Sequence, residues 1–103
     1  MKKRIFNLYV DLVCDSCGIL KTDLFSKKKL HLYSNARFIL YYICSQRPMK
    51  VIEIKDLCVA NGYNLARQSI DYGIKKIKDS IDDPDNKDIR ILIESCLKEL
   101  EDD

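Results

Sequence analysis

Glycine and proline are scarce in this chain, which has only three Gly and two Pro among 103 residues. A β-sandwich with many tight turns and a disordered linker both need more of these residues, and no low-complexity run is present. Helices are therefore favoured, and the length predicts a single domain over residues 1–103. Long apolar runs are also lacking, since none approaches the ~18 residues that a membrane helix requires. No membrane partner is predicted.

Histidine is rarer still, since His31 is the only one. No Ser, His and Asp set, no glycine-rich phosphate-binding loop and no pair of carboxylates occurs at a useful spacing for catalysis. Cys14 and Cys17 form a CxxC motif, but zinc needs a second pair of ligands. The other candidate ligands are scattered singly: Cys44, Cys58, Cys96 and His31. The sequence predicts no enzyme, cofactor, metal or nucleotide, and it favours Cys14 and Cys17 as small core residues.

The cysteine count is odd, and nothing resembles a secretory signal peptide. Basic residues open the chain, but the apolar run after them is interrupted by Asn7, Asp11 and Asp15. A reducing compartment is therefore expected, and the predicted location is the cytoplasm.

Charge is divided unequally along the chain. Residues 1–50 contain ten Lys or Arg and three Asp, whereas residues 51–103 contain eight basic and thirteen acidic residues. This asymmetry indicates a half that faces a polyanion and a half that faces solvent.

Apolar residues at intervals of three and four predict a helix over residues 5–17, which Gly18 is expected to end. A segment that is apolar around most of its circumference, residues 35–46 with Ser34 as N-cap, predicts the central helix of a bundle. The other predicted helices span residues 22–25 (a short turn), 51–60, 65–80 and 85–100. The expected fold is all-α, a small bundle of about five to six helices.

Two of these helices, 51–60 and 65–80, are joined by a turn that contains Gly62 and Asn64. The second has a polar and basic outer face, and this arrangement is typical of a helix-turn-helix. In such a motif Asn64, Arg67 and Gln68 would meet base edges, since Arg suits guanine and Gln suits adenine.

A basic loop precedes the central helix. Lys27, Lys28 and Lys29 are followed by His31 and, one turn into the predicted helix, by Arg37. Cations beside a helix N-terminus suit a phosphate backbone, although most lysine runs are only solvated surface. We predict that the loop contacts DNA, and for His31 we favour a nucleic-acid contact slightly over a neutral surface role.

The order of these features resembles the C-terminal DNA-binding domain of the bacterial replication initiator DnaA, which has a Trp-repressor-like helix-turn-helix. The resemblance extends over about residues 5–100. Its motifs are Asp23-Leu24-Phe25-Ser26-Lys27-Lys28-Lys29, Ala36-Arg37 opening an apolar helix, Glu53-Ile54 opening the next, and Lys75-Lys76-Ile77.

The resemblance implies a basic loop on the DNA backbone and in the minor groove, and a recognition helix in the major groove. By position, Lys27, Lys28, Lys29, His31 and Arg37 fall on the loop and helix start. Arg67, Gln68 and Ser69 fall at the exposed start of the recognition helix. Where the family has a "GRDHTTV" run, this chain has Asn64-Leu65-Ala66-Arg67-Gln68-Ser69-Ile70. The initiator's own binding site is therefore not predicted for this chain.

The sequence thus predicts a double-stranded DNA-binding helix-turn-helix protein that regulates transcription or replication for a phage or mobile element. The alternative is a helical protein-interaction or structural module that keeps the fold, forms a homo-oligomer or binds a protein partner, and does not read DNA sequence. RNA binding is a third, weaker reading.

Overall fold

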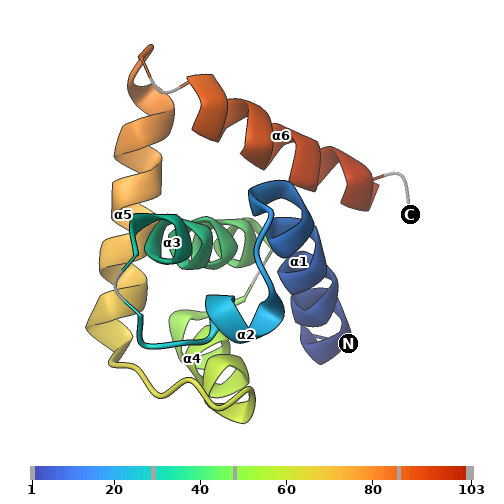
Figure 1. Ribbon diagram of the computed structural model, residues 1–103, viewed down its shortest axis with the longest axis vertical. Coiled ribbons are helices and arrows are strands. Elements are labelled where there is room, and N and C mark those ends of the chain that lie inside the picture. The colour runs from blue at the N-terminus through green and yellow to red at the C-terminus, as the bar shows by residue number, and fades with distance from the viewer. Residues whose placement is uncertain (1, 29, 48, 86, 102–103) are drawn as a thin grey trace.

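The computed structural model describes residues 2–28, 30–47, 49–85 and 87–101. Of residues 99–101 it describes the backbone only. Within these ranges the chain forms six helices and no strand, so the predicted all-α fold is confirmed (Figure 1). The helices are α1 (Lys2–Cys17), α2 (Lys21–Leu24), α3 (His31–Gln46), α4 (Val51–Ala60), α5 (Arg67–Asp82) and α6 (Lys87–Glu101).

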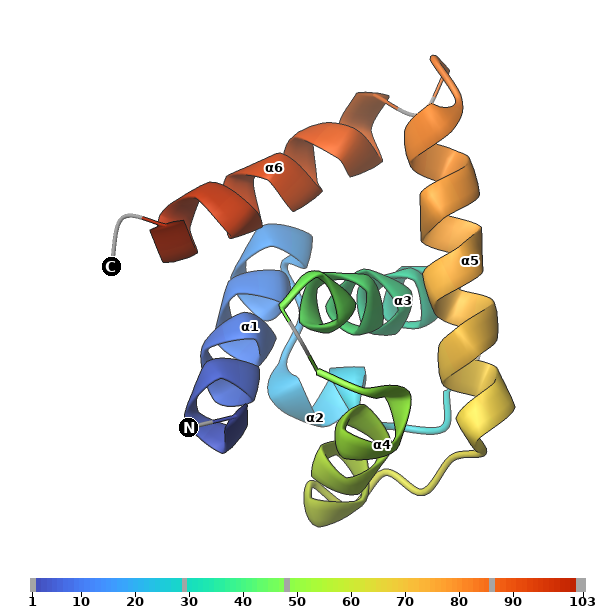
Figure 2. The same ribbon diagram turned by 180° about the vertical axis from the view of Figure 1, so that it is seen from behind.

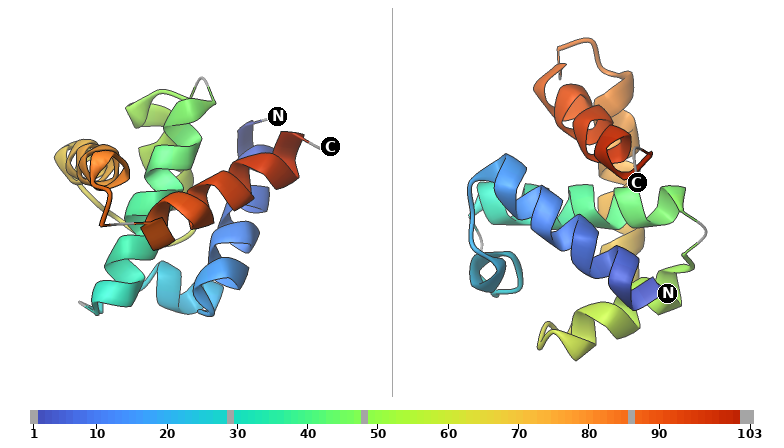
Figure 3. Two further views of the ribbon diagram at one scale, coloured as in Figure 1. Left: turned by 90° about the horizontal axis from the view of Figure 1, so that it is seen from above. Right: turned by 90° about the vertical axis from the view of Figure 1, so that its right-hand side faces the viewer.

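Helix α3 is the centre of the bundle, as its apolar circumference predicts. It contacts each of the other five helices, with α5 along one side and α1 along the other (Figures 1 and 2). Figure 3 shows α3 running between α6 and α4. Its fully buried side chains include Leu40, Ile43 and Cys44. Tyr41 is also buried, and Tyr42 is partly buried at the edge of the core.

Helix α1 buries the stripe of apolar residues that its sequence predicts. Phe6, Tyr9, Val10 and Val13 are all buried, which places one face of α1 against α3. Gly18 has a φ of +68°, and the N–H of Ile19 donates to the carbonyl oxygen of Cys14 at 3.1 Å. This is the helix end expected of glycine.

The approach of α3 to α5 depends on Gly73. A Cβ atom at this position would lie 2.6 Å from Cδ1 of Phe38 and 3.1 Å from Cδ2 of Tyr41. Such distances are far below normal contact, so the absent side chain lets α5 pack closely on α3. This packing positions the start of α5 beside the first turns of α3.

Several helix boundaries differ from the sequence prediction. α3 begins at His31 rather than at residue 35, because Leu30 takes the extended N-cap conformation and its carbonyl oxygen accepts the N–H of Ser34 at 3.0 Å. Ser34 is therefore inside the first turn and is not the N-cap. Tyr33, predicted in a loop, is helical too.

Helix α5 begins two residues later than predicted, at Arg67. Leu65 instead stays in the loop of residues 61–66, where it packs partly buried against the core. The turn after α4 forms at the predicted place, since Gly62 has a φ of +81° and the N–H of Tyr63 donates to the carbonyl oxygen of Cys58 at 3.0 Å. Helix α4, this turn and α5 thus follow one another as a helix, a turn and a helix, and α4 and α5 are in contact.

Candidate nucleic-acid interface

Two loops that are far apart in the sequence meet beside the start of α5. The ammonium of Lys27 donates a hydrogen bond to the carbonyl oxygen of Asn64 and lies 4.1 Å from the ring centroid of Tyr63. The rings of Phe25 and Tyr63 are 6.3 Å apart. A hydrogen bond and a cation–π contact from one lysine therefore fix the basic loop against the loop of residues 61–66.

The predicted polar residues are mostly exposed. His31 begins α3 instead of lying in the loop, which corrects its predicted position, and its side chain faces solvent. Arg67, Gln68 and Ser69 form the first turn of α5. The exposed members of the predicted set are Lys27, Lys28, His31, Asn64, Arg67, Gln68 and Ser69. Lys29 lies outside the described residues.

Arg37 differs from this set because it is only 6% exposed. Its Nη1 donates to the carbonyl oxygens of Leu24 at 2.9 Å and Ser26 at 3.1 Å, and its Nη2 donates to Oγ of Ser34 at 3.3 Å. The guanidinium also lies 5.1 Å from the ring centroid of Tyr63.

The sequence analysis places Arg37 one turn into the helix as a DNA contact, and the structure shows that the residue is buried there. Its side chain turns inward because two carbonyls at the end of α2 need donors, and a guanidinium can serve both at once. Arg37 therefore connects α3 to the beginning of the basic loop.

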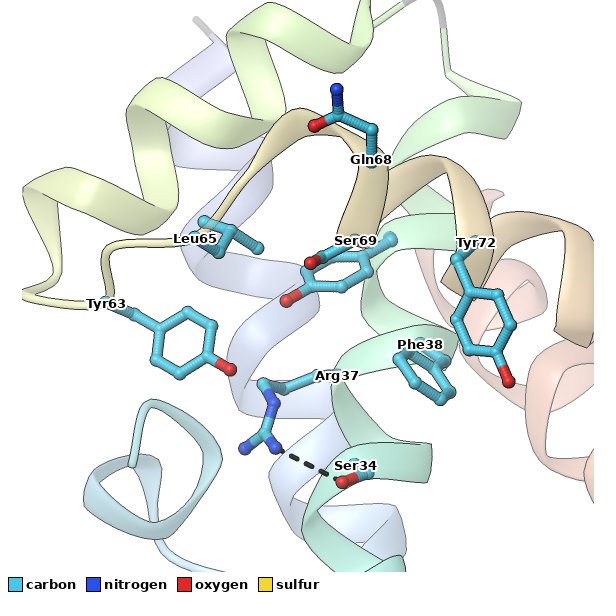
Figure 4. Close-up of a pocket in the computed structure, with 9 residues that line it drawn as sticks. Ser34, Arg37, Phe38, Tyr63, Leu65, Gln68, Ser69 and Tyr72 are labelled. Atoms are coloured by element: carbon cyan, nitrogen blue, oxygen red, sulfur yellow. Dashed lines mark hydrogen bonds between the residues drawn. The ribbon is translucent and has the colours of Figure 1, made fainter. Parts of the chain in front are cut away.

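A pocket of about 360 Å³ lies between the first turns of α3, the loop of residues 61–66 and the start of α5 (Figure 4). Figure 4 shows the guanidinium of Arg37 between Tyr63 and Ser34, with Gln68 and Ser69 on the α5 side. The full lining is Ser34, Arg37, Phe38, Tyr41, Tyr63, Leu65, Gln68, Ser69 and Tyr72. The pocket thus brings Arg37, Gln68 and Ser69, three of the predicted site residues, to one place.

Sequence reasoning missed the aromatic edge of this pocket. Tyr72 is 59% exposed, and its ring meets that of Phe38 edge-on at 5.8 Å. Lys76 lies 5.8 Å from the ring centroid of Phe38 and 5.9 Å from that of Tyr72. The spacing of Ser69, Tyr72 and Lys76 at intervals of three and four was the available signal, since such residues share one face of a helix.

The charge of Arg37 affects the pKa values of two buried groups in the core. Burial raises the pKa of Cys58 to about 12, and the nearby guanidinium of Arg37 opposes that rise. Burial likewise raises the pKa of Tyr41 strongly, again against the charge of Arg37. These groups stay neutral near pH 7, so Arg37 supplies a positive charge without a titrating partner beside it.

No disulfide joins any of the five cysteines, all of which lie in described parts of the chain; Cys17 is half-buried and the others are buried. This agrees with the core role predicted for Cys14 and Cys17. Among the described residues, no group of three or more His, Cys, Asp or Glu could hold a metal ion. The helices of that part of the chain are also too short or too polar to cross a membrane.

Comparisons with protein-family models, with curated proteins and with solved structures found no match for this chain. The resemblance to the DnaA C-terminal domain therefore stays a prediction from the sequence motifs.

Proposed function

We propose that this protein binds double-stranded DNA through the basic loop and the start of α5. The single observation that carries the proposal is the contact of Lys27 with Asn64 and Tyr63, which joins the loop cations to the start of the second helix of the helix-turn-helix. Lys28, next to Lys27 in the chain, and Arg67, three residues after Asn64, are both exposed. Phosphate contacts from the loop would set the register, and Arg67, Gln68 and Asn64 would meet base edges.

The proposal extends to a regulator of transcription or replication in a phage or mobile element, acting in the cytoplasm without enzymatic activity. Its support is the order of sequence motifs together with the helix, turn and helix of α4 and α5. Because the recognition run departs from that of the initiator, the DNA sequence bound is expected to differ.

Salt-dependent binding tests the role of the loop. A variant with Lys27→Ala and Lys28→Ala should bind every duplex more weakly, and its slope of log affinity against log salt should flatten by about one unit per lost phosphate contact. The matched control is Lys87→Ala with Lys98→Ala, which removes two exposed lysines from α6. Fluorescence anisotropy with a labelled duplex gives both affinities. Equal binding by parent and loop variant at every salt concentration would rule out the loop assignment.

Recognition of the DNA sequence is tested separately with the Arg67→Ala variant. Losing a bidentate contact to a base should remove about 1–3 kcal/mol of discrimination while leaving the salt slope nearly unchanged. Selection of bound duplexes from a random pool, done in parallel for parent and variant, measures this preference. An unchanged selected motif would show that Arg67 reads no base. Competition with single-stranded RNA separates DNA binding from RNA binding.

A protein-interaction module is the second candidate function, and exposed leucines favour it. Leu30 and Leu32, beside the basic loop, are 55% and 50% exposed, and Leu20 is 69% exposed. Exposed apolar side chains gathered in one segment are typical of protein interfaces. A stable oligomer in light scattering, together with no duplex binding at low salt, would select this function over DNA binding.

A further inference from the structure

The pocket beside the start of α5 contains a buried positive charge with no anionic partner. The charge belongs to Arg37, a residue that is only 6% exposed. Its acceptors are two carbonyl oxygens and one hydroxyl, and none of the carboxylates in the described residues pairs with it. Buried charges are normally paired with an opposite charge, so this arrangement leaves room for an anion.

Arg37 also has N–H groups that make no hydrogen bond within the described residues. A guanidinium carries five N–H groups, and the three hydrogen bonds to Leu24, Ser26 and Ser34 use three of them. The Nε–H and one Nη2–H have no acceptor among the described residues. No fully buried side-chain nitrogen or oxygen in that part of the chain lacks a partner, so the unpartnered Nε is not completely buried. The pocket that Arg37 lines is the opening through which it is reached.

The rest of the lining suits an anion as well. The hydroxyls of Ser34 and Ser69 and the amide of Gln68 can donate, and no acidic side chain lines the pocket. Tyr63 and Tyr72 provide ring faces and edges beside these donors. Such rings suit a sugar or base attached to the anion, whereas the guanidinium suits tetrahedral oxyanions that accept two parallel hydrogen bonds.

We propose that this pocket binds one phosphate group, with Arg37 as its charged ligand and Ser34, Gln68 and Ser69 as neutral donors. The phosphate comes either from the backbone of bound DNA or from a free mononucleotide. The backbone source rests on the proposed function, and the free source does not.

The test follows the Nε–H signal of Arg37 in the full ¹⁵N-labelled chain by NMR. The signal is assigned by its absence from the Arg37→Lys variant. Inorganic phosphate, adenosine 5′-monophosphate and a short DNA duplex are added in separate titrations at constant ionic strength. The signal should shift and saturate with at least one of these probes, because phosphate oxygens would accept the Nε–H.

A charge variant locates the effect in the pocket. Gln68→Glu places a carboxylate in the lining and should weaken binding of the active phosphate probe by about tenfold or more through like-charge repulsion. The matched control is Gln46→Glu, the same change on an exposed residue at the end of α3, away from the pocket. The control should keep the affinity of the parent to within about twofold.

Each outcome decides between the sources or against the site. A shift with phosphate or the mononucleotide supports a free ligand, and a shift with the duplex alone supports a backbone phosphate. No shift of the Arg37 signal with any probe, or equal weakening by Gln68→Glu and Gln46→Glu, overturns the proposal. If the duplex binds through the lysine loop while the Arg37 signal stays unmoved, the pocket proposal fails and the DNA-binding proposal stands. If free phosphate shifts the Arg37 signal but the chain binds no duplex, the pocket proposal stands and the DNA-binding proposal fails.

Discussion

The two sides of α3 are built by different kinds of contact. On the side of the pocket, polar groups join separate segments: Lys27 reaches Asn64, and Arg37 reaches Leu24 and Ser26. On the side of α1 and α6, buried apolar residues such as Ile93 and Cys96 of α6 predominate, and one guanidinium hydrogen bond runs from Arg47 Nε to the hydroxyl of Tyr9 at 3.0 Å. There the hydroxyl of Ser16 and the thiol of Cys96 lie 3.9 Å apart as a weak polar contact.

This difference indicates that one kind of contact stabilises the helical bundle and the other fixes the positions of its loops. Apolar contacts are non-directional and roughly proportional to buried area, so they hold α6 onto the bundle without specifying single atoms. Hydrogen bonds from a guanidinium are directional and fix where a loop lies. The side of the pocket has more of these directional contacts, so the positions of its loops are fixed more directly.

Among substitutions that test this comparison, removing Arg37 should have the largest effect on the free energy of unfolding. Arg37→Ala deletes three hydrogen bonds from a charged donor and leaves the carbonyls of Leu24 and Ser26 without their partner. We expect a loss of about 3–5 kcal/mol in the free energy of unfolding, a large share of the stability of a small domain. Urea unfolding followed by circular dichroism measures it. The control Arg67→Ala, on an exposed arginine, should change stability by less than about 0.5 kcal/mol. Similar losses for both arginines would contradict the buried role of Arg37.

Filling the space at Gly73 should have a smaller effect than removing Arg37. The methyl of Gly73→Ala would meet the rings of Phe38 and Tyr41 at 2.6 and 3.1 Å, so either these rings or α5 must shift. Overpacking costs about 1–3 kcal/mol, which the better helix propensity of alanine offsets by about 1 kcal/mol. We expect a net destabilisation of about 1 kcal/mol, measured by thermal unfolding.

A double-mutant cycle provides the control for Gly73. Phe38→Leu removes the ring that comes closest, so Gly73→Ala should cost less in that background than in the parent. An equal cost in both backgrounds would show that the ring does not limit the approach of α5 to α3.

The last expected effect appears only at alkaline pH and concerns the buried thiol of Cys58. Burial raises its pKa to about 12, whereas a thiol in the unfolded chain titrates near its ordinary value of about 8.5. The proton is therefore held more tightly in the folded state, so stability is constant below about pH 8.5 and falls as pH rises toward 12. One such thiol contributes a slope of up to about 1.4 kcal/mol per pH unit in that window.

The measurement compares Cys58→Ala with the parent at pH 8 and pH 10. The variant should lose less stability than the parent between these two values, by about 1–2 kcal/mol. Iodoacetamide labelling at pH 8, read by mass spectrometry, should modify half-buried Cys17 faster than Cys58. Equal pH dependence in parent and variant would mean that Cys58 is not protected as its burial implies.

Local patterns were enough to predict most of the fold. The stripe of residues in α1, the apolar circumference of α3 and the glycines at 18 and 62 act through neighbours within one or two turns, and all have the expected outcome. The start of α3 was predicted wrongly because Ser34 is a strong N-cap by type, yet Leu30 takes that place. Cap preferences amount to about 1 kcal/mol, which tertiary contacts of the flanking residues can outweigh.

The candidate site was predicted only in part. The exposed residues Lys27, Asn64 and Gln68 are where the pattern suggested, but nothing in the sequence indicates that Lys27 would contact Asn64, 37 positions away. Tyr72 was missed because its spacing from Ser69 and Lys76 shows only that the three share a helix face. Its ring contact with Phe38 depends on how α5 packs on α3.

By itself, the sequence determined the helical class, the order of the helices and the residues that face the core. These follow from the periodicity of apolar side chains and from glycine at helix ends, which are properties of short segments. Only the tertiary structure decided that Arg37 is buried, that the basic loop is fixed against the loop of residues 61–66, and that Gly73 lets α5 approach α3. Each of these depends on which distant segments meet, because burial, donor and acceptor pairing and close packing are set by the neighbours in space.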